Sequence, residues 1–380
     1  MLPLDGLKVV DFSQGVAGPF GAMLMGDFGA EVIKIEPLGG DWSRTMGARV
    51  GDTESATYLA INRNKRSIAI DLKDSRCLGV AKELVTGADI VVQNYRPGVM
   101  ARYGLDYATL SPSRPDLIYC SVSGFGSEGP WVNYPSGDST IQAWAGLMSI
   151  VGGADDEPTR VGNVVSDILT GMNIFQGALL AILNRARTGK GTEVEVSLMD
   201  SMIAFQTPAF AEFLATGSVP GRTGNHHPLV TPSGLFKTRD SSIVFSVLQH
   251  QWPAFCAFFG MPELATNPAF AQNPDRRANR AALTAILQPL FASESTAEAL
   301  RRLRACDVQC APVNDYAGVA ADPQVQLNGM LQSIDHPTLG STPFVRNPVK
   351  VRGLDPARAC APILGSTPSP CCGTQVARQT

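Results

Sequence analysis

The chain has few charged residues and almost no net charge. Only 17% of its 380 residues are charged, and the formal net charge is −3 at pH 7. No field of one sign therefore attracts nucleic acid or an anionic membrane. The hydrophobic content of 44% is ordinary for a globular protein. We expect no nucleic-acid partner, and any phosphate binding has to be local.

The sequence also shows little that predicts a secretory signal or a membrane span. Its first residues have neither the basic region nor the apolar region of a secretory signal. The most apolar long window, at about residues 164–184, contains Asp167, Asn173 and Gln176. These polar residues favour a buried helix over a membrane span. We therefore expect a cytoplasmic protein with no membrane partner.

A metal-binding pattern is missing as well. The eight cysteines show no paired metal spacing, and the four histidines lie far from most of them. Cys306 and Cys310 can share a helix face, but a structural zinc site needs four ligands. We interpret them as small apolar residues of a helix and predict no metal. Free thiols suit a reducing compartment.

The first two hundred residues alternate between strand-like and helix-like segments. Apolar runs with β-branched residues on both faces predict a parallel sheet covered by helices. We expect an α/β fold with a Rossmann-like, doubly wound sheet. The predicted strands are 8–12, 31–36, 67–72, 88–92 and 117–122, and helical patterns lie at 20–28, 74–86, 97–110 and 168–185.

A second, smaller unit follows a Gly, Ser and Pro cluster at 216–224. We predict a large domain at 1–215, a linker at 216–230 and a small α+β domain at 231–330. Two strands within 233–247 and helices at 252–260 and 279–307 are expected in the small domain. The chain beyond 354 is rich in Pro, Ser and Cys without periodicity, which predicts an irregular, poorly ordered tail.

The turn after the first strand is built from small residues, DFSQGVAGP at 11–19. Such a turn lets backbone amides approach a phosphate, and Glu36 stands where a ribose-binding acid would be. However, the spacing G-x-x-G-P lacks the G-x-G-x-x-G fingerprint and puts Pro19 at the helix start. A plain tight turn is therefore favoured over an NAD site.

Two further segments each allow two interpretations. The NRNKRS run at 62–67 either binds phosphates at the sheet edge or is a solvated charged loop. The NYRPG run at 94–98 follows the carboxyl end of a strand, where ligands of open α/β sheets bind. It either sandwiches an adenine or forms a simple Pro-Gly turn.

Asp167 stands at the start of the long helical pattern and also has two interpretations. Aspartate is a preferred helix N-cap residue. The same place suits an attacking carboxylate, because helix-end amides help to hold it ionised and oriented. This residue alone does not decide between them.

Taken together, these segments resemble the class III CoA-transferases, also called the CaiB/BaiF family, over roughly residues 3–355. Any one match would be unspecific, whereas their order along the chain is specific. The matching elements are DFSQGVAGP at 11–19, GDFGAEVIKIEP at 26–37, NRNKRSIAIDLK at 62–73, NYRPG at 94–98, SVSGFG at 121–126, DSTIQAWAGLM at 138–148, the G-x-x-x-S-D-x-x-T-G run at 162–171, RTGKG at 187–191 and GNHHP at 224–228.

The resemblance implies a catalytic nucleophile, Asp167, and an interlocked homodimer. It also implies that residues 331–380 return to the large domain before the tail ends. A coenzyme A thioester would be the substrate, with no permanently bound cofactor. The residues implied to contact CoA are Gly15, Val16, Ala17, Ile70, Lys73, Asn94, Tyr95 and Arg102.

The implied activity is transfer of CoA from an acyl-CoA donor to a free carboxylic acid, through acyl-aspartyl anhydride and aspartyl-CoA intermediates. Succinyl-CoA with a dicarboxylic acid is our preferred pair. The side chains that would neutralise a second carboxylate, or else serve as ordinary polar residues, are Arg44, Arg160, His226 and His227.

Two alternatives to transfer remain. An α-methylacyl-CoA racemase or epimerase would use His just before Asp138, where this sequence has Gly137, so half of the proton machinery is missing. A non-catalytic CoA-binding subunit is opposed by the retention of Asp167 with its whole flanking motif. The loop expected in formyl-CoA:oxalate enzymes is replaced by residues 226–230.

Overall fold

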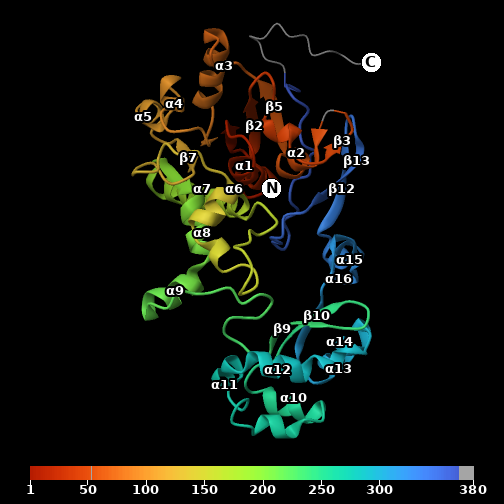
Figure 1. Ribbon diagram of the computed structural model, residues 1–380. Coiled ribbons are helices and arrows are strands. Elements are labelled where there is room, and N and C mark those ends of the chain that lie inside the picture. Colours follow the sequence, from red (N-terminus) through yellow and green to blue (C-terminus); the bar gives the residue numbers. More distant parts are fainter. Residues whose placement is uncertain (53, 368–380) are drawn as a thin grey trace. The chain divides into compact units, whose positions relative to one another are not determined.

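A computed structural model describes residues 1–52 and 54–367 (Figure 1). The chain folds into two compact units. Among the described residues, the larger comprises 1–52, 54–147, 160–218 and 324–367, and the smaller comprises 148–159 and 219–323. The predicted large domain at 1–215 is therefore wrong for 148–159. That segment joins the smaller unit because Gly224 N–H donates to Gly152 O at 2.9 Å and the Arg222 guanidinium donates to Gly153 O at 3.1 Å.

The larger unit is built on one parallel sheet of six strands, in the order β5-β2-β1-β6-β7-β8. Counted along the chain, this is the Rossmann order 3-2-1-4-5-6, whose switch point lies between β1 and β6. The doubly wound fold is therefore confirmed. The strands are β1 (Lys8–Asp11), β2 (Glu31–Glu36), β5 (Lys65–Ala69), β6 (Ile90–Gln93), β7 (Ile118–Ser123) and β8 (Thr192–Ser197).

Strand β8 was not predicted from the sequence. Its letters, TEVEVS, alternate polar and apolar residues, and it pairs only with β7 at the edge of the sheet. An edge strand needs no continuous apolar run, because its exposed face meets water. The five predicted strands all form, with ends shifted by up to three residues.

Both faces of the sheet are buried. Val10 and Val91, which pair in register, pack in one cluster with residues of α3 (Ser75–Thr86). Their neighbours Val9 and Ile90 are also buried and point to the opposite face. Helices α1 (Ala17–Asp27) and α7 (Val165–Thr188) pack against each other and against strands of this sheet.

Two glycines allow α1 and α7 to approach closely. A Cβ at Gly171 would lie 2.7 Å from Ala17 O, and a Cβ at Gly21 would lie 2.9 Å from Gly171 O. Any larger side chain would push the helices apart. The contact places the first turn of α7, with Asp167, beside the turn that follows β1.

The remaining elements of the larger unit are short. The predicted helix at 97–110 is two helices separated by Gly104, whose φ is +64°. These elements are α2 (Ala56–Ile61), α4 (Val99–Arg102), α5 (Tyr107–Leu110), α6 (Asp138–Trp144), α8 (Leu198–Phe205), α9 (Thr207–Thr216), the 3-10 helix η1 (Trp42–Thr45), and the strand pairs β3 (Arg49–Val50) with β4 (Glu54–Ser55) and β12 (Leu331–His336) with β13 (Gly340–Val345). Two more lie at unit boundaries, η2 (Leu147–Ser149) and α16 (Pro323–Asn328).

The smaller unit is an antiparallel sheet with helices around an aromatic core, as its α+β prediction requires. Its strands are β9 (Ser233–Lys237), β10 (Ser242–Ser246) and β11 (Gln309–Pro312). The core includes Phe236, Phe245, Phe255 and Phe291. Pro289 at a helix start and the Ser295 cap divide the predicted helix at 279–307. Its helices are α10 (Trp252–Phe258), η3 (Pro262–Ala265), α11 (Asn273–Ala278), α12 (Arg280–Leu287), α13 (Pro289–Ala292), α14 (Thr296–Ala305) and α15 (Tyr316–Ala321).

Residues 354–367 form no helix or strand, yet they are anchored to the larger unit. Ala357 N–H donates to Asp27 O and Thr367 N–H donates to Ser67 O, each at 2.8 Å, and Ala361 is buried. The prediction of poor order is wrong for this segment. The rest of the predicted tail, at 368–380 with Cys371 and Cys372, lies outside the described residues.

Helix α7 is long and apolar enough, by length and composition alone, to cross a membrane. In the structure it packs against α1, α8, β7 and β8 and carries Asp167. Core helices of soluble proteins pass the same test. Among residues 1–52 and 54–367, no group of three or more His, Cys, Asp or Glu is placed to hold a metal ion.

Candidate active site

The turn after β1 is joined to the end of β6 by one asparagine. Gln14 N–H donates to Asn94 Oδ1 at 2.9 Å, and Asn94 Nδ2 donates to Gln14 O at 2.7 Å. The Gln14 side chain also donates to the Tyr95 hydroxyl at 3.1 Å. These bonds lie at the carboxyl ends of β1 and β6, where the strand order reverses and ligands of such folds bind.

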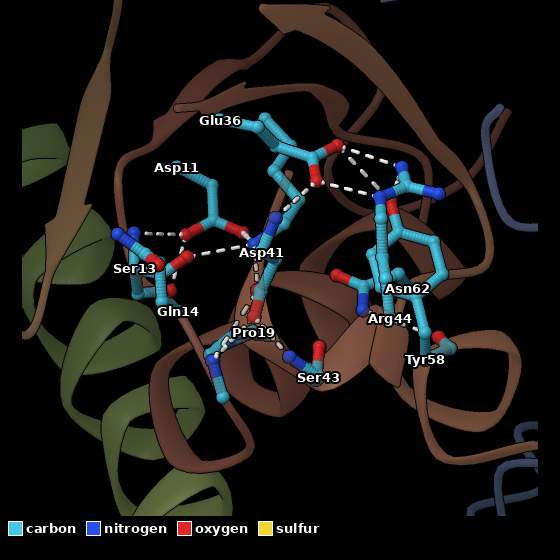
Figure 2. Close-up of polar contacts among 12 residues, drawn as sticks. Asp11, Ser13, Gln14, Pro19, Glu36, Asp41, Ser43, Arg44, Tyr58 and Asn62 are labelled. Carbon is cyan, nitrogen blue, oxygen red and sulfur yellow. Dashed lines mark hydrogen bonds and ion pairs between the residues drawn. The ribbon is translucent and has the colours of Figure 1, made fainter. Parts of the chain in front are cut away.

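A buried set of four charges, called here the turn network, lies against this turn, and Figure 2 labels its two acids, Asp11 and Asp41. It consists of Asp11, Lys34, Asp41 and Lys65. Lys34 lies 2.8 Å from Asp41, and Lys65 lies 2.8 Å from Asp11. Burial alone would raise the pKa of Asp11, but the two lysines outweigh it and lower that pKa. Burial lowers the pKa of Lys65 to about 8.

The turn network also binds the backbone of the turn. Lys34 Nζ donates to Ser13 O at 2.7 Å, and Lys65 Nζ donates to Pro19 O at 2.8 Å. Gly15 N–H donates to the Asp41 carboxylate at 3.0 Å. Gly15 has φ of +80°, and a Cβ there would come within 2.2 Å of the Trp42 ring. Only glycine fits this position, and the turn is rigidly placed.

A second buried network, drawn beside the first in Figure 2, contains Arg44. Its guanidinium binds the carboxylates of Glu36 and Glu54, each at 2.8 Å, and donates to Pro362 O at 3.0 Å. Arg44 is therefore fully engaged, so its suggested role with a substrate carboxylate is wrong. Glu36 is engaged with it and is not available to a ribose.

The cations of the 62–67 segment are used inside the fold. Arg63 pairs with Asp27, and Lys65 belongs to the turn network. Arg66 pairs with Glu31 at the surface. Neither predicted alternative, a phosphate site or a solvated loop, describes Arg63 and Lys65, because both are buried.

Asp167 lies in the first turn of α7, and it is not the N-cap. Val164 holds that position, without a side-chain hydrogen bond. Within the described part of the chain, no hydrogen bond reaches the Asp167 carboxylate. Burial raises the pKa of Asp167 to about 7, and the charge of Asp138 adds to the rise. A carboxylate of this kind holds a proton more tightly than usual and is a stronger base when ionised.

Asp138, at the start of α6, accepts a hydrogen bond at the N-terminus of α7, where the N-cap residue Val164 makes no side-chain bond. Asp138 Oδ1 accepts from Ser166 N–H and from Ser166 Oγ, both at 2.9 Å. Asp138 Oδ2 accepts from Gln142 Nε2 at 2.7 Å. Arg160 Nη1 lies 3.7 Å from the same oxygen. The preceding Gly137 offers no side chain for proton transfer.

A cavity of about 880 Å³ brings these groups together within the larger unit. Val16 and Ala17 line it from the turn, Asn94 and Tyr95 from the end of β6, and Asp167 from α7. Five of the predicted site residues therefore share one space. Asp138, Arg160 and Trp42 also line it.

Four other predicted CoA-contact residues do not line this cavity. Gly15 belongs to the turn but is covered by Trp42. Ile70 is buried in the core beneath the sheet face, whereas Lys73 and Arg102 are exposed. Their contacts with CoA stay predictions. His226 and His227 belong to the smaller unit and do not line the cavity either.

Sequence reasoning missed the turn network and the role of Asp138. A signal for the first was present: Lys34 interrupts an otherwise apolar strand, EVIKIE. A lysine in a buried strand needs an acid nearby, and Asp11 and Asp41 supply it. The Asp138 role had no local signal, because Ser166 is 28 residues away.

Comparison with known proteins now decides the family. The model of CoA-transferase family III matches residues 4–367. The chain belongs to CoA-transferase family III. It is thus an enzyme of the CoA-transferase class.

Individual family III relatives are similar over most of their length. The chain is 40% identical to acetyl-CoA:oxalate CoA-transferase of Acetobacter aceti over 93% of this chain and 90% of that protein. It is 36% identical to succinyl-CoA:glutarate CoA-transferase of Homo sapiens over 89% of this chain and 78% of that protein. The crystal structure of a CAIB/BAIF family protein from Brucella suis matches with a TM-score of 0.86 and 36% identity, over 96% of this chain and 97% of that chain.

Proposed function

We propose that this enzyme moves CoA from an acyl-CoA donor, such as succinyl-CoA, to a free carboxylic acid, with Asp167 as the covalent nucleophile. The observation that carries the proposal is the state of Asp167. It lines a cavity at the switch point of a Rossmann-like sheet, receives no hydrogen bond from the described residues, and has a pKa raised to about 7. The structural carboxylates Asp11 and Glu36 are hydrogen-bonded instead, and their pKa values are lowered.

The proposed reaction begins when ionised Asp167 attacks the thioester carbonyl of the donor. The C–S bond breaks, CoA leaves as a thiolate, and a mixed anhydride forms. A thiolate is a workable leaving group because the pKa of a thiol is about 8.5. The CoA thiolate then attacks the aspartyl carbonyl of the anhydride, which releases the donor acid and leaves an aspartyl-CoA thioester.

The second half of the reaction repeats these steps with the acceptor. The acceptor carboxylate attacks the aspartyl thioester, and CoA thiolate leaves as a new anhydride forms. The thiolate attacks the acceptor acyl carbon, which completes the new acyl-CoA and restores the Asp167 carboxylate. One thioester replaces another, so the balance requires no ATP.

We propose a dicarboxylic acid as the acceptor. Two relatives have names that specify dicarboxylic acids, oxalate and glutarate. Arg160 supports the same class in this chain. It lines the cavity, its side chain is 50% exposed, and its contact with Asp138 is long, at 3.7 Å. Its Nη1 also donates to Ser139 Oγ, at 3.3 Å, which is an exposed contact. A guanidinium with only these two long contacts in the described part of the chain can rotate to a second carboxylate, and Arg is suited to bidentate carboxylate binding.

The acceptor class is tested by comparing glutarate with butyrate, which is glutarate without its second carboxylate, with succinyl-CoA as the donor. In Arg160→Gln, KM for glutarate should rise by about 10-fold or more, as expected for a lost hydrogen bond to a charged group. KM for butyrate should stay within about twofold. An equal rise for both acids would refute the role of Arg160.

We also propose an interlocked homodimer located in the cytoplasm. Helix α9 buries none of its residues within one chain, and Leu214 is 77% exposed. Helix α7 exposes Leu180 and Leu183 as well. A second copy is the simplest cover for these apolar faces. The free thiols of Cys77, Cys120 and Cys256 suit a reducing compartment. Sedimentation velocity at low concentration should show a dimer, and a compact monomer would refute it.

The covalent role of Asp167 is tested with two variants. Asp167→Ala should lower the transfer rate by at least about 100-fold, the low end for removing a catalytic group, while CoA binding measured by calorimetry survives. Asp200 is a matched control, because it lies in the first turn of α8 and does not line the cavity. Asp200→Ala should retain activity.

The intermediate itself gives a second readout. During turnover, hydroxylamine should trap an acyl group at Asp167, and mass spectrometry of the digested protein locates it. If wild-type enzyme exchanges CoA without any capture at Asp167, the covalent proposal fails. Capture that vanishes in Asp167→Ala and persists in Asp200→Ala supports it.

A further inference from the structure

Asp138 differs from every other acid beside the nucleophile in its connections to α7. Its Oδ1 accepts two hydrogen bonds from Ser166, the residue immediately before Asp167. Because Val164 provides no side-chain cap, this carboxylate is the group that satisfies a first-turn amide of α7. Asp138 is only 8% exposed, so water does not substitute for it readily.

The other side of Asp138 is fixed by α6 and by the segment before α7. Gln142, one turn along α6, donates to Asp138 Oδ2 at 2.7 Å, and its side-chain oxygen accepts from Val161 N–H at 2.9 Å. The side-chain nitrogen of Gln142, Nε2, also donates to Asn163 O at 3.2 Å. The carboxylate is thus held between two helices and cannot turn without breaking these bonds.

We propose that Asp138 is the positioning residue of the nucleophile: its carboxylate takes the place of the missing cap of α7, fixes the turn that carries Asp167, and sets a negative charge beside the attacking group. This role rests on the proposed function of Asp167. It adds that a second acid, which never touches the acyl group, controls when and how strongly Asp167 attacks.

The hydrogen-bond donors around Asp138, and their absence around Asp167 in the described chain, explain why the two acids have different proposed roles. Every partner of Asp138 is a hydrogen-bond donor or a cation, which matches an ionised, acceptor-only carboxylate. Asp167 has no such partner in the described chain and faces a like charge. Two acids whose surroundings differ in this way take different roles in a reaction.

The remaining charged groups of the cavity have to be considered too. Around Asp167, burial and the charge of Asp138 account for the raised pKa, and no other group contributes a resolved effect. Arg160 lies against Asp138 and partly offsets its charge. The charged side chains that line the cavity with Asp167 are Arg96, Asp106, Asp138, Arg160, Glu193 and Glu195.

The test is the pH dependence of kcat/KM for succinyl-CoA between pH 5 and 9, which reports ionisations of the free enzyme. Wild-type activity should rise with pH around a midpoint near 7, the pKa of Asp167. Asp138→Asn keeps the shape and removes the charge. Its midpoint should fall by about one pH unit, the effect of losing one nearby like charge. Its plateau should fall by about tenfold, because the nucleophile becomes a weaker base and loses its fixed orientation.

Two further variants separate charge from structure. Ser166→Ala removes one hydrogen bond to Asp138 but keeps its charge, so the midpoint should not move. Arg160→Gln removes the cation that offsets Asp138, so the midpoint should rise. The same donor is used throughout, so ionisations of the donor cancel in the comparison. The Arg160 variant also keeps the test decisive if Asp138→Asn does not fold.

The outcomes distinguish this inference from the proposed function. If hydroxylamine traps an acyl group at Asp167 but the midpoint is the same in wild type, Asp138→Asn and Arg160→Gln, the inference is overturned and the nucleophile stands. A lower rate at every pH with no change in midpoint would reduce Asp138 to a structural residue. If wild-type enzyme exchanges CoA without capture at Asp167, the proposed function fails first.

Discussion

The buried acids of the turn network and the buried acid Asp167 have opposite electrostatic surroundings. In the turn network, Asp11 and Asp41 each lie within 2.8 Å of a lysine that has no solvent exposure. Asp167 instead has a like charge as its neighbour, and burial raises its pKa. The network uses its charges to hold a turn, whereas the Asp167 carboxylate accepts no hydrogen bond from the described residues and its pKa is raised to about 7. One unit therefore holds two kinds of buried acid: paired acids that hold a turn, and an acid without a partner in the described part of the chain.

Breaking the turn network should give the largest change in stability. In Lys65→Met, Asp11 loses its shortest ion pair, and Pro19 O loses its donor. Removal of one partner from a buried pair costs about 3–5 kcal/mol. Urea unfolding at pH 7 should show this loss. A change below about 1 kcal/mol would contradict the view that these charges hold the turn.

Acid should remove stability that Glu36 supplies. Burial alone would raise the pKa of Glu36, but Arg44 and Lys34 outweigh it and lower that pKa from 4.5 to about 2. A lowered pKa means that the stabilisation is complete above about pH 4.5 and is lost as the pH falls toward 2. At 1.36 kcal/mol per pH unit, the loss approaches about 3 kcal/mol. Unfolding at pH 5 and at pH 2.5 checks it, and Glu36→Gln should flatten the dependence.

The contribution of Asp167 to stability should depend on pH with the opposite sign. Its folded-state pKa of about 7 lies above the ordinary 3.8, so ionisation destabilises the fold as the pH rises through this range. Asp167→Asn should therefore stabilise the protein by about 0.5–2 kcal/mol at pH 8, and under the proposed function it should also inactivate the enzyme. The gain should shrink as the pH falls toward 4. Equal melting temperatures of wild type and variant at pH 8 would show that Asp167 is not strained by its surroundings.

The smallest change in the free energy of unfolding is expected at Arg66, which is the neighbour in sequence of Lys65, where the largest change is expected. Arg66 follows Lys65 on β5, but it pairs with Glu31 at the surface, where the two side chains are 58% and 45% exposed. Arg66→Met should change the free energy of unfolding by no more than about 1 kcal/mol, because exposed ion pairs contribute little. A loss comparable to that in Lys65→Met would show that burial does not decide the strength of these pairs.

The sheet was predictable because its central strands consist mainly of apolar, β-branched residues. Ile90–Gln93 and Glu31–Glu36 lie where the sequence predicted strands. The edge strand β8 was not predictable in this way, since its apolar residues alternate with the exposed residues Glu193 and Glu195. The boundary at 148–159 was missed because membership of a unit depends on contacts with residues some 70 positions away, such as Gly224 with Gly152.

An ordered set of motifs predicted Asp167 as the candidate nucleophile, whereas no pattern predicted the groups that surround it. Asp167 as an isolated letter favours an N-cap, and the structure gives that position to Val164. In the sequence, the cations at 62–67 look available to bind phosphate. In the structure, Arg63 and Lys65 form ion pairs with Asp27 and Asp11. Such pairings join residues 36 and 54 positions apart. Local patterns carry no information about them.

The way the chain is divided has a consequence for modularity. It passes between the two units at four places: Leu147 to Met148, Thr159 to Arg160, Ser218 to Val219 and Pro323 to Gln324. The smaller unit is therefore not a cassette that one deletion removes, because excision of 219–323 leaves 148–159 behind without its partners. That short segment also connects the helix of Asp138 to the helix of Asp167. Gene fusions or truncations that respect only the obvious linker near 216–224 would leave the connection between the two acids unsupported.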